Sequence, residues 1–375
     1  MKNIFALCFP LFFFNIQILA AQSAQNPNII LITTDGLRWQ EVFNGIDTTL
    51  IPKENFAQFI NYKGKDIIES REKLMPFFWN SLVNKGQLHG NRKYGNRMDT
   101  KNYHRFSYPG YSEMLCGFFD PKVNSNSKVL NKNTSVLEVM NFTGEYANSV
   151  SVFSSWEVFP YILNGPRSNL MINAGWQQVN SGIVSDRLRL LNKGNLNPPA
   201  WKGETRYDDL TWNMALEYLK LNHPKCMFIS LDDTDHFGHK SDYYGYLTAI
   251  KQFDAYLQEI WEFIEQDPVY KNNTYILVTT DHGRGTTKNT WSRHGILPYT
   301  SGEIWMFELG PTIPAIGELK TKVQRHQSSV ALKIASYANV SFRDYVKAPA
   351  AIQTLSWNDD NMLNTESKVK RNPAP

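Results

Sequence analysis

Residues 28–36 read NIILITTDG, an apolar, β-rich run that ends in a carboxylate and a glycine. Three similar runs follow along the chain, at 226–231 (CMFISL), 274–280 (TYILVTT) and 303–309 (EIWMFEL). Their nearly continuous hydrophobicity is typical of parallel strands that are covered on both faces. The four runs therefore predict the strands of one largely buried sheet.

Helical patterns lie between and after these runs. Apolar residues recur at helical spacing over 209–221, 243–266 and 328–338, which predicts a helix in each segment. Alternating strands and helices indicate an α/β fold, with a mostly parallel central sheet and helices on both of its faces.

The composition limits the class of protein. A chain of 375 residues with 42% hydrophobic and 20% charged residues is globular, and it fits one large α/β domain or two modest ones. The net charge of +4, without a basic stripe, gives no signal for nucleic-acid binding. A weakly positive balance is compatible with anionic small-molecule substrates.

The N-terminus has the pattern of a secretory signal. Lys2 precedes an apolar stretch, and small residues follow it. We expect a signal peptide over residues 1–24, cleaved after Ala21 or Ala24, and a periplasmic or secreted protein. Pro10 interrupts the apolar stretch, so a stable membrane span is the weaker interpretation.

The remainder of the chain is expected to form one domain over residues 25–345. Within it, 160–206 is rich in Asn, Gly and Pro and predicts a loop-rich cap or insertion. Residues 346–375 lose periodicity and are expected to be a tail. Cys116 and Cys226 remain after removal of the signal peptide; whether they pair stays open at this point.

Polar residues that can bind a metal follow three of the predicted strands. In a parallel sheet, the carboxyl ends of the strands lie along one edge, and ligands bind at that edge. The candidates are Asp35, the segment DDTDHFGH (232–239), Asp281 and His282, and then His294 in SRHG. Three carboxylates and three imidazoles suffice for two divalent ions, and mixed oxygen and nitrogen donors favour zinc. The alternative is a set of polar turns whose side chains are satisfied locally.

The segment HRFSYPGYSEMLCG (104–117) offers a nucleophile. Pro109 and Gly110 are expected to bend the chain and present Ser107 at the mouth of a helix that begins near Tyr111. Backbone N–H groups at such a helix start would face a phosphate. Ser112 is a rival that falls inside this helix, and a simple polar turn is the alternative.

Five motifs in this order, LITTDGLR, SYPGYSEMLCG, DTDHFGH, TTDHGRG and SRHG, resemble those of the alkaline phosphatase superfamily of metallohydrolases. The similarity spans roughly residues 27 to 340. It is greatest to the branch of nucleotide pyrophosphatases/phosphodiesterases and secreted alkaline phosphatases.

The resemblance implies a role for each matching residue. The first metal would be held by Asp235, His239 and His294, and the second by Asp35, Asp281 and His282. Ser107 would be the nucleophile and a further ligand of the second metal. Asn124 or Asn126 would bind a phosphate oxygen. The expected activity is a zinc-dependent phosphatase or phosphodiesterase that forms a covalent phospho-enzyme.

Some features depart from this family. Ser107 stands where many relatives have Thr, and Tyr111 stands where formylglycine sulfatases have Arg, which argues against a formylglycine enzyme. A sulfate or phosphonate ester hydrolase, a phosphomutase-like enzyme and a non-catalytic binding relative remain as alternatives. The natural substrate and the oligomeric state stay open.

Overall fold

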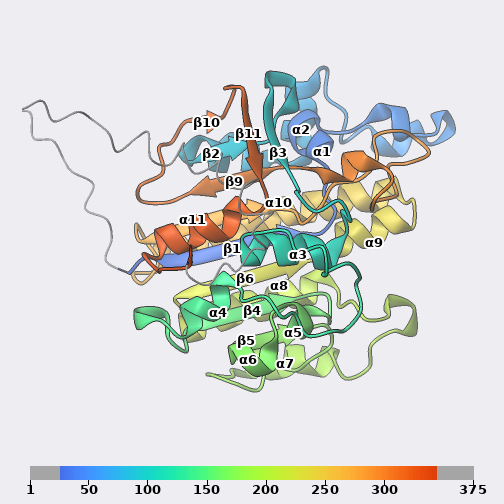
Figure 1. Ribbon diagram of the computed structural model, residues 1–375. Coiled ribbons are helices and arrows are strands. Elements are labelled where there is room, and N and C mark those ends of the chain that lie inside the picture. The colour runs from blue at the N-terminus through green and yellow to red at the C-terminus, as the bar shows by residue number, and fades with distance from the viewer. Residues whose placement is uncertain (1–25, 344–375) are drawn as a thin grey trace, which may run out of the picture.

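The structure, a computed structural model, describes residues 26–343 (Figure 1). The predicted signal peptide, 1–24, and the predicted tail, 346–375, lie outside the described residues. The strands are β1 (Asn28–Thr34), β2 (Gln87–His89), β3 (Asn96–Asp99), β4 (Val150–Ser154), β5 (Met171–Ala174), β6 (Cys226–Leu231), β7 (Thr274–Thr279), β8 (Glu303–Ile304), β9 (Met306–Leu309), β10 (Gly317–Glu318) and β11 (Val323–His326). The α-helices are α1 (Trp39–Asn44), α2 (Ile67–Leu74), α3 (Ser107–Cys116), α4 (Val136–Asn141), α5 (Phe159–Ile162), α6 (Gly165–Ser168), α7 (Asp186–Gly194), α8 (Asp208–Asn222), α9 (Asp233–His239), α10 (Tyr243–Gln266) and α11 (Ser329–Tyr337).

An eight-stranded sheet runs through the molecule in the order β10-β2-β9-β7-β1-β6-β4-β5. The five strands from β7 to β5 are parallel, and β1 lies between β6 and β7. Three of the predicted strands are therefore neighbours at the centre of the sheet. A separate three-stranded sheet contains β11, β3 and β8.

The predicted strand 303–309 differs from expectation. It divides into β8 and β9, which belong to different sheets, and β9 pairs antiparallel with both β7 and β2. Continuous hydrophobicity reports burial on both faces of a strand, which β9 has, but it carries no information about strand direction.

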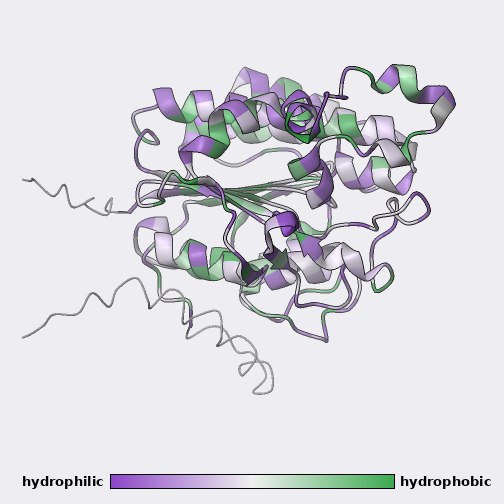
Figure 2. Ribbon diagram, turned by 90° about the horizontal axis from the view of Figure 1, so that it is seen from above, coloured by the Kyte–Doolittle hydropathy of each residue, from purple (hydrophilic) through white to green (hydrophobic). Residues whose placement is uncertain are grey.

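Helices cover both faces of the central sheet, as predicted (Figure 2). Successive side chains of a strand point to opposite faces, so β1 contributes to two separate cores. Ile30 and Ile32 pack in the core beneath α1, α2, α8 and α10, whereas Ile29 and Leu31 pack in the core beneath α3, α4, α5 and α11. The predicted helices 209–221, 243–266 and 328–338 correspond to α8, α10 and α11 within one residue at each end.

The segment 160–206 contains more regular structure than its composition suggests. Strand β5 pairs in parallel with β4 and forms one edge of the central sheet, and α6 and α7 flank it. Loops connect these elements. The segment therefore completes the sheet on one side as well as supplying loops near its carboxyl edge.

Two further expectations concern cysteines and membranes. Cys116 in α3 and Cys226 in β6 are both buried, free thiols, so the alternative of a disulfide between them is not realised. Over residues 26–343, no helix is both long enough and apolar enough to cross a membrane.

Candidate metal centre

Three neighbouring strands place the predicted ligands at one edge of the sheet. Asp35 directly follows β1, Asp281 and His282 follow β7, and Asp235 lies in α9, which begins two residues after β6. Gly36 has φ of +64°, a conformation that glycine adopts without strain, and its N–H donates to Asp281 Oδ1 at 3.1 Å. The turn after β1 is thereby tied to the end of β7.

Asp35, Asp281 and His282 form one group of buried side chains. One ligand atom of each lies within 4.8 Å of the others. His282 Nε2 is 3.3 Å from Asp35 Oδ1 and 3.5 Å from Asp281 Oδ2. His282 Nδ1 lies 2.9 Å from the carbonyl oxygen of Gly283, to which it donates, so Nε2 is the nitrogen that presents a lone pair to the group.

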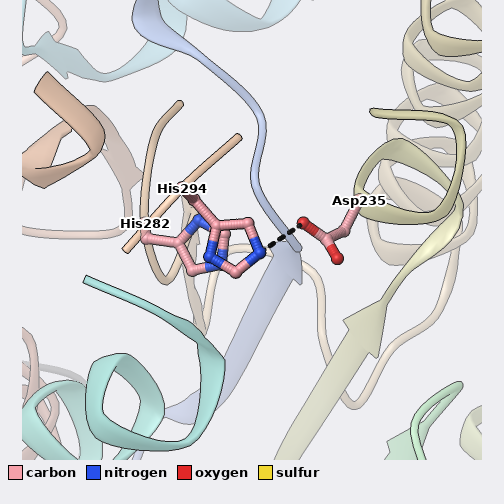
Figure 3. A group of neighbouring side chains, drawn as sticks. All are labelled: Asp235, His282 and His294. Atoms are coloured by element: carbon pink, nitrogen blue, oxygen red, sulfur yellow. Dashed lines mark ion pairs between the residues drawn. The ribbon is translucent and has the colours of Figure 1, made fainter. Parts of the chain in front are cut away.

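Asp235, His282 and His294 form a second group, which shares His282 with the first (Figure 3). The rings of His282 and His294 stack with centroids 4.1 Å apart, and Asp235 faces them. His239, at the end of α9, adjoins this group: its Nε2 is 3.0 Å from Asp235 Oδ2 and 2.9 Å from His294 Nε2. All six predicted ligands thus meet at one place, although His282 adjoins both groups.

The chemistry of this donor set fits divalent metal ions. Asp35 Oδ1 and Asp281 Oδ2 are buried and have no hydrogen-bond partner, which is costly for a carboxylate oxygen unless a cation binds it. Burial and the neighbouring carboxylates raise the pKa of Asp35 well above its usual value and that of Asp281 to about 8. Burial also lowers the pKa of His294 to about 4, which keeps its imidazole in the neutral, metal-binding form.

Asp235 differs from the other two carboxylates because it has a cationic neighbour. The guanidinium of Arg284 forms an ion pair with Asp235 Oδ1. Burial acts to raise the pKa of Asp235, but Arg284 and the nearby histidines hold it well below its usual range. Asp235 is therefore ionised at neutral pH.

Ser107 is the first residue of α3, so the helix begins four residues earlier than predicted. Pro109 is accommodated because its missing N–H lies in the first turn, where helices leave N–H groups unpaired. Ser107 Oγ lies 3.4 Å from His282 Nε2. Gly110 allows this approach, because a Cβ at that position would lie 2.6 Å from the carbonyl oxygen of Asp281.

The rival nucleophile Ser112 lies inside α3, as expected, and accepts a hydrogen bond from Asn131 Nδ2 at 3.0 Å. Asn126 Oδ1 accepts from the Tyr108 N–H at 3.0 Å, beside Ser107. Asn124 lines a cavity of about 300 Å³ together with Tyr108. Both asparagines are thus near the start of α3, and Asn126 has the direct hydrogen bond to it.

Two residues at this edge were not recognised from the sequence. Asp208 accepts hydrogen bonds from the N–H groups of Asp232 and Asp233, both at 2.8 Å, and so supports the turn between β6 and α9. Arg284 is 1% exposed and forms an ion pair with Asp235 Oδ1. Neither role has a sequence signal, because both depend on which distant segments meet in the fold.

Comparison with protein families supports a metal-dependent enzyme. Residues 201–298 match the family model of the Metalloenzyme superfamily. That segment contains five of the predicted ligands: Asp235, His239, Asp281, His282 and His294.

Two curated relatives match less than a quarter of the chain. A phosphopentomutase from Shewanella woodyi is 32% identical over 98 residues, which cover 24% of this chain and 22% of that protein. A phosphopentomutase from Pseudothermotoga lettingae is 28% identical over 85 residues, or 22% of this chain and 20% of that protein. The chain thus spans about a fifth of the length of these relatives.

Solved structures share the fold over most of the chain. The lipoteichoic acid synthase LtaP from Listeria monocytogenes aligns with a TM-score of 0.56 and 12% identity, over 86% of this chain and 76% of that one. The alkaline phosphatase PafA aligns with a TM-score of 0.55 and 10% identity, over 84% and 96%. The chain therefore has the fold of the alkaline phosphatase superfamily, and its residues 201–298 match the model of the Metalloenzyme superfamily.

Proposed function

We propose that the protein is an exported two-metal hydrolase of phosphoric esters, a phosphatase or phosphodiesterase, with Ser107 as its nucleophile. The observation that carries this proposal is the position of Ser107 Oγ, at the first residue of α3 and 3.4 Å from His282 Nε2. His282 in turn adjoins buried carboxylate oxygens that have no hydrogen-bond partner. Metal-assisted phosphoryl transfer uses a nucleophile that lies beside the side chains that bind the metal ions.

Each residue has a stated part in this proposal. Asp235, His239 and His294 would hold the first ion, and Asp35, Asp281 and His282 the second. Bound divalent ions, of which zinc best suits these donors, would supply positive charge that stabilises the entering and leaving oxygens. The N-terminal end of α3 would orient the anionic phosphoryl group, with Asn126 beside it.

The proposed reaction has two displacements. Ser107 Oγ loses its proton and forms a bond to phosphorus as the ester P–O bond breaks, and the leaving alcohol takes up a proton. Water then attacks phosphorus in the phosphoserine, which releases inorganic phosphate or a monoester and restores the serine hydroxyl. Both steps conserve charge and need no further co-reactant.

Export is proposed from the N-terminal sequence, in which a basic start, an apolar stretch and small residues follow one another. The protein would then act in the periplasm or outside the cell on a small-molecule ester.

Phosphomutase activity is the second candidate, because both curated relatives reported above are named phosphopentomutases. Their similarity covers only 24% and 22% of this chain, so it does not carry their substrate over to this protein. A sulfate or phosphonate ester hydrolase on the same centre is the third. Parallel assays on matched phosphate, phosphonate and sulfate esters, and on a sugar phosphate, separate these activities.

The primary test is turnover of p-nitrophenyl phosphate and bis-p-nitrophenyl phosphate by the zinc-loaded protein. Ser107→Ala is expected to lower kcat at least about a thousandfold, because the covalent step is lost. Ser112→Ala is the matched control in the same helix and is expected to retain turnover. Full activity in Ser107→Ala would show that Ser107 is not the nucleophile.

A further inference from the structure

Arg284 connects three segments that carry predicted ligands. It belongs to the segment that follows Asp281 and His282. Its Nη2 donates to the Asp235 carbonyl oxygen at 3.0 Å and forms an ion pair with Asp235 Oδ1, and its Nη1 donates to the carbonyl oxygen of Ser292 at 2.8 Å. Ser292 lies two residues before His294, so the guanidinium joins the end of β7, helix α9 and the His294 loop.

Two glycines provide the space that this guanidinium occupies. A Cβ on Gly238 would lie 2.4 Å from Arg284 Cζ, and a Cβ on Gly36 would lie 3.0 Å from Arg284 Nε. Gly36 and Gly238 come from the turn after β1 and from α9, both of which bear predicted ligands. Arg284 Nε is buried without a hydrogen-bond partner, so the position of this side chain is set by Asp235 and Ser292.

The two oxygens of Asp235 have different neighbours. Oδ1 faces Arg284, whereas Oδ2 lies 3.0 Å from His239 Nε2. His239 Nε2 is in turn 2.9 Å from His294 Nε2. His294 Nε2 lies 3.8 Å from Asp235 Oδ1, so His239 and His294 both adjoin Asp235, and Arg284 holds the oxygen that His239 does not contact.

We propose that Arg284 is a positioning residue for the first metal ion. By fixing the Asp235 carboxylate and the chain before His294, it keeps Asp235, His239 and His294 facing a single cation. The inference deepens the proposed function and rests on it, because it concerns the same metal centre. It assigns Arg284 to metal binding and not to contact with the substrate, since the side chain is buried.

The test measures metal binding directly, by elemental analysis and by competition with a chromophoric zinc chelator. Arg284→Met is expected to weaken binding of the first ion about 10- to 100-fold and leave the second ion bound, the usual effect of removing a group that orients a ligand. Arg284→Lys keeps the charge but cannot bond both Asp235 and Ser292, so it is expected to recover part of the affinity.

Gly238→Ala tests the same idea without altering Arg284. The new methyl group displaces the guanidinium, so weaker binding of the first ion is expected. Alanine favours helix formation by about 1 kcal/mol relative to glycine, so this loss cannot result from a weaker helix. Gly194→Ala in α7, where a Cβ would lie at 3.4 Å from Leu210, is the matched control.

Arg206→Met is the control for loss of a buried arginine. Arg206 donates to Thr211 Oγ1 at 2.9 Å and to Asn173 Oδ1 at 2.8 Å. Its removal is expected to lower stability and leave both ions bound.

The outcomes separate this inference from the proposed function. Failure of the unaltered protein to bind divalent ions would overturn the proposed function, and the inference with it. Two ions bound with unaltered affinity in Arg284→Met, or in Gly238→Ala if the arginine variant does not fold, would overturn the inference alone. An equal loss of affinity in Arg206→Met would do so as well.

Discussion

Asp208 and Asp281 are both buried carboxylates at the same edge of the sheet, yet their surroundings differ. Asp208 Oδ1 accepts from the Ser155 hydroxyl at 2.6 Å and from the Asp232 N–H, and its Oδ2 accepts from the Asp233 N–H. Asp281 Oδ1 accepts from the Gly36 N–H, but Oδ2 has no donor.

Burial raises the pKa of both groups, of Asp208 to about 7 and of Asp281 to about 8, with a neighbouring carboxylate adding to the shift. Burial and pKa therefore do not distinguish a structural carboxylate from a metal ligand. The distinction lies in whether the protein supplies donors to both oxygens. The protein supplies hydrogen-bond donors to both oxygens of Asp208, whereas Asp281 Oδ2 has a partner only if a cation binds it.

The largest expected effect follows from Asp281→Asn. This change keeps an acceptor for the Gly36 N–H and replaces the unpartnered oxygen by an NH₂ group. We expect kcat/KM to fall about a thousandfold, because charge stabilisation by the bound ions is worth several kcal/mol.

The metal-free variant is expected to melt no lower than the metal-free parent at neutral pH, because a buried carboxyl that is already protonated there is replaced by a neutral amide of similar size. Steady-state kinetics of the zinc-loaded variant measures the loss of kcat/KM, and calorimetry of the metal-free variant and parent measures the melting temperature. A metal-free variant whose melting temperature lies well below that of its parent would show that Asp281, like Asp208, has a structural role.

Asp208→Ala is expected to have the opposite signature. The N–H groups of Asp232 and Asp233 lose their acceptors, so the free energy of unfolding should fall by about 2–4 kcal/mol with or without metal. Urea denaturation of the chelator-treated protein measures this loss. Unchanged stability of the metal-free variant would remove the contrast between the two carboxylates.

The smallest expected effect is a pH dependence of the metal-free protein. The pKa of Asp281 is raised from 3.8 to about 8 on folding, so unfolding releases its proton between these values and stability falls as pH rises. The pKa of His294 is lowered from 6.5 to about 4, so its contribution to stability rises with pH, but only up to pH 6.5.

Of these two groups, only Asp281 changes its contribution to stability between pH 6.5 and about 8. The Tm of the chelator-treated protein should therefore decrease over this interval. Zinc loading should remove the decrease, because the carboxylate is then ionised in the folded state. A Tm that is constant or rises over this interval in the metal-free protein would contradict the raised pKa of Asp281.

The sequence predicted the central strands and the ligand edge well, for a physical reason. β1, β6 and β7 are buried on both faces, and an aspartate follows each within two residues, so pattern and chemistry coincide. The direction of β9 could not be predicted, because an antiparallel strand buried on both faces has the same hydrophobic pattern. β4 and β5 are short and contain polar residues, and they were not recognised as strands.

The sequence predicted which aspartates and histidines lie together at the candidate site, but not the residues that support them. Aspartate and histidine after a strand indicate a metal through their own chemistry. Arg284 and Asp208 act through contacts with residues that are 49 and 24 positions away in the chain, and no local pattern reports such contacts. The start of α3 was misplaced because Pro109 was read as a bend before the helix, whereas it is part of the first turn.

Gly110 has a consequence for how this protein could change over evolution. Helix α3, which begins at Ser107, meets the end of β7 through main-chain atoms at this residue, with no side chain between them. The spacing between Ser107 and the ligands is therefore insensitive to most substitutions in the surrounding loops. Laboratory selection for activity on a new ester should accordingly yield substitutions in the loops and leave the reaction chemistry unchanged. Gly110→Ala should be among the least tolerated substitutions in α3.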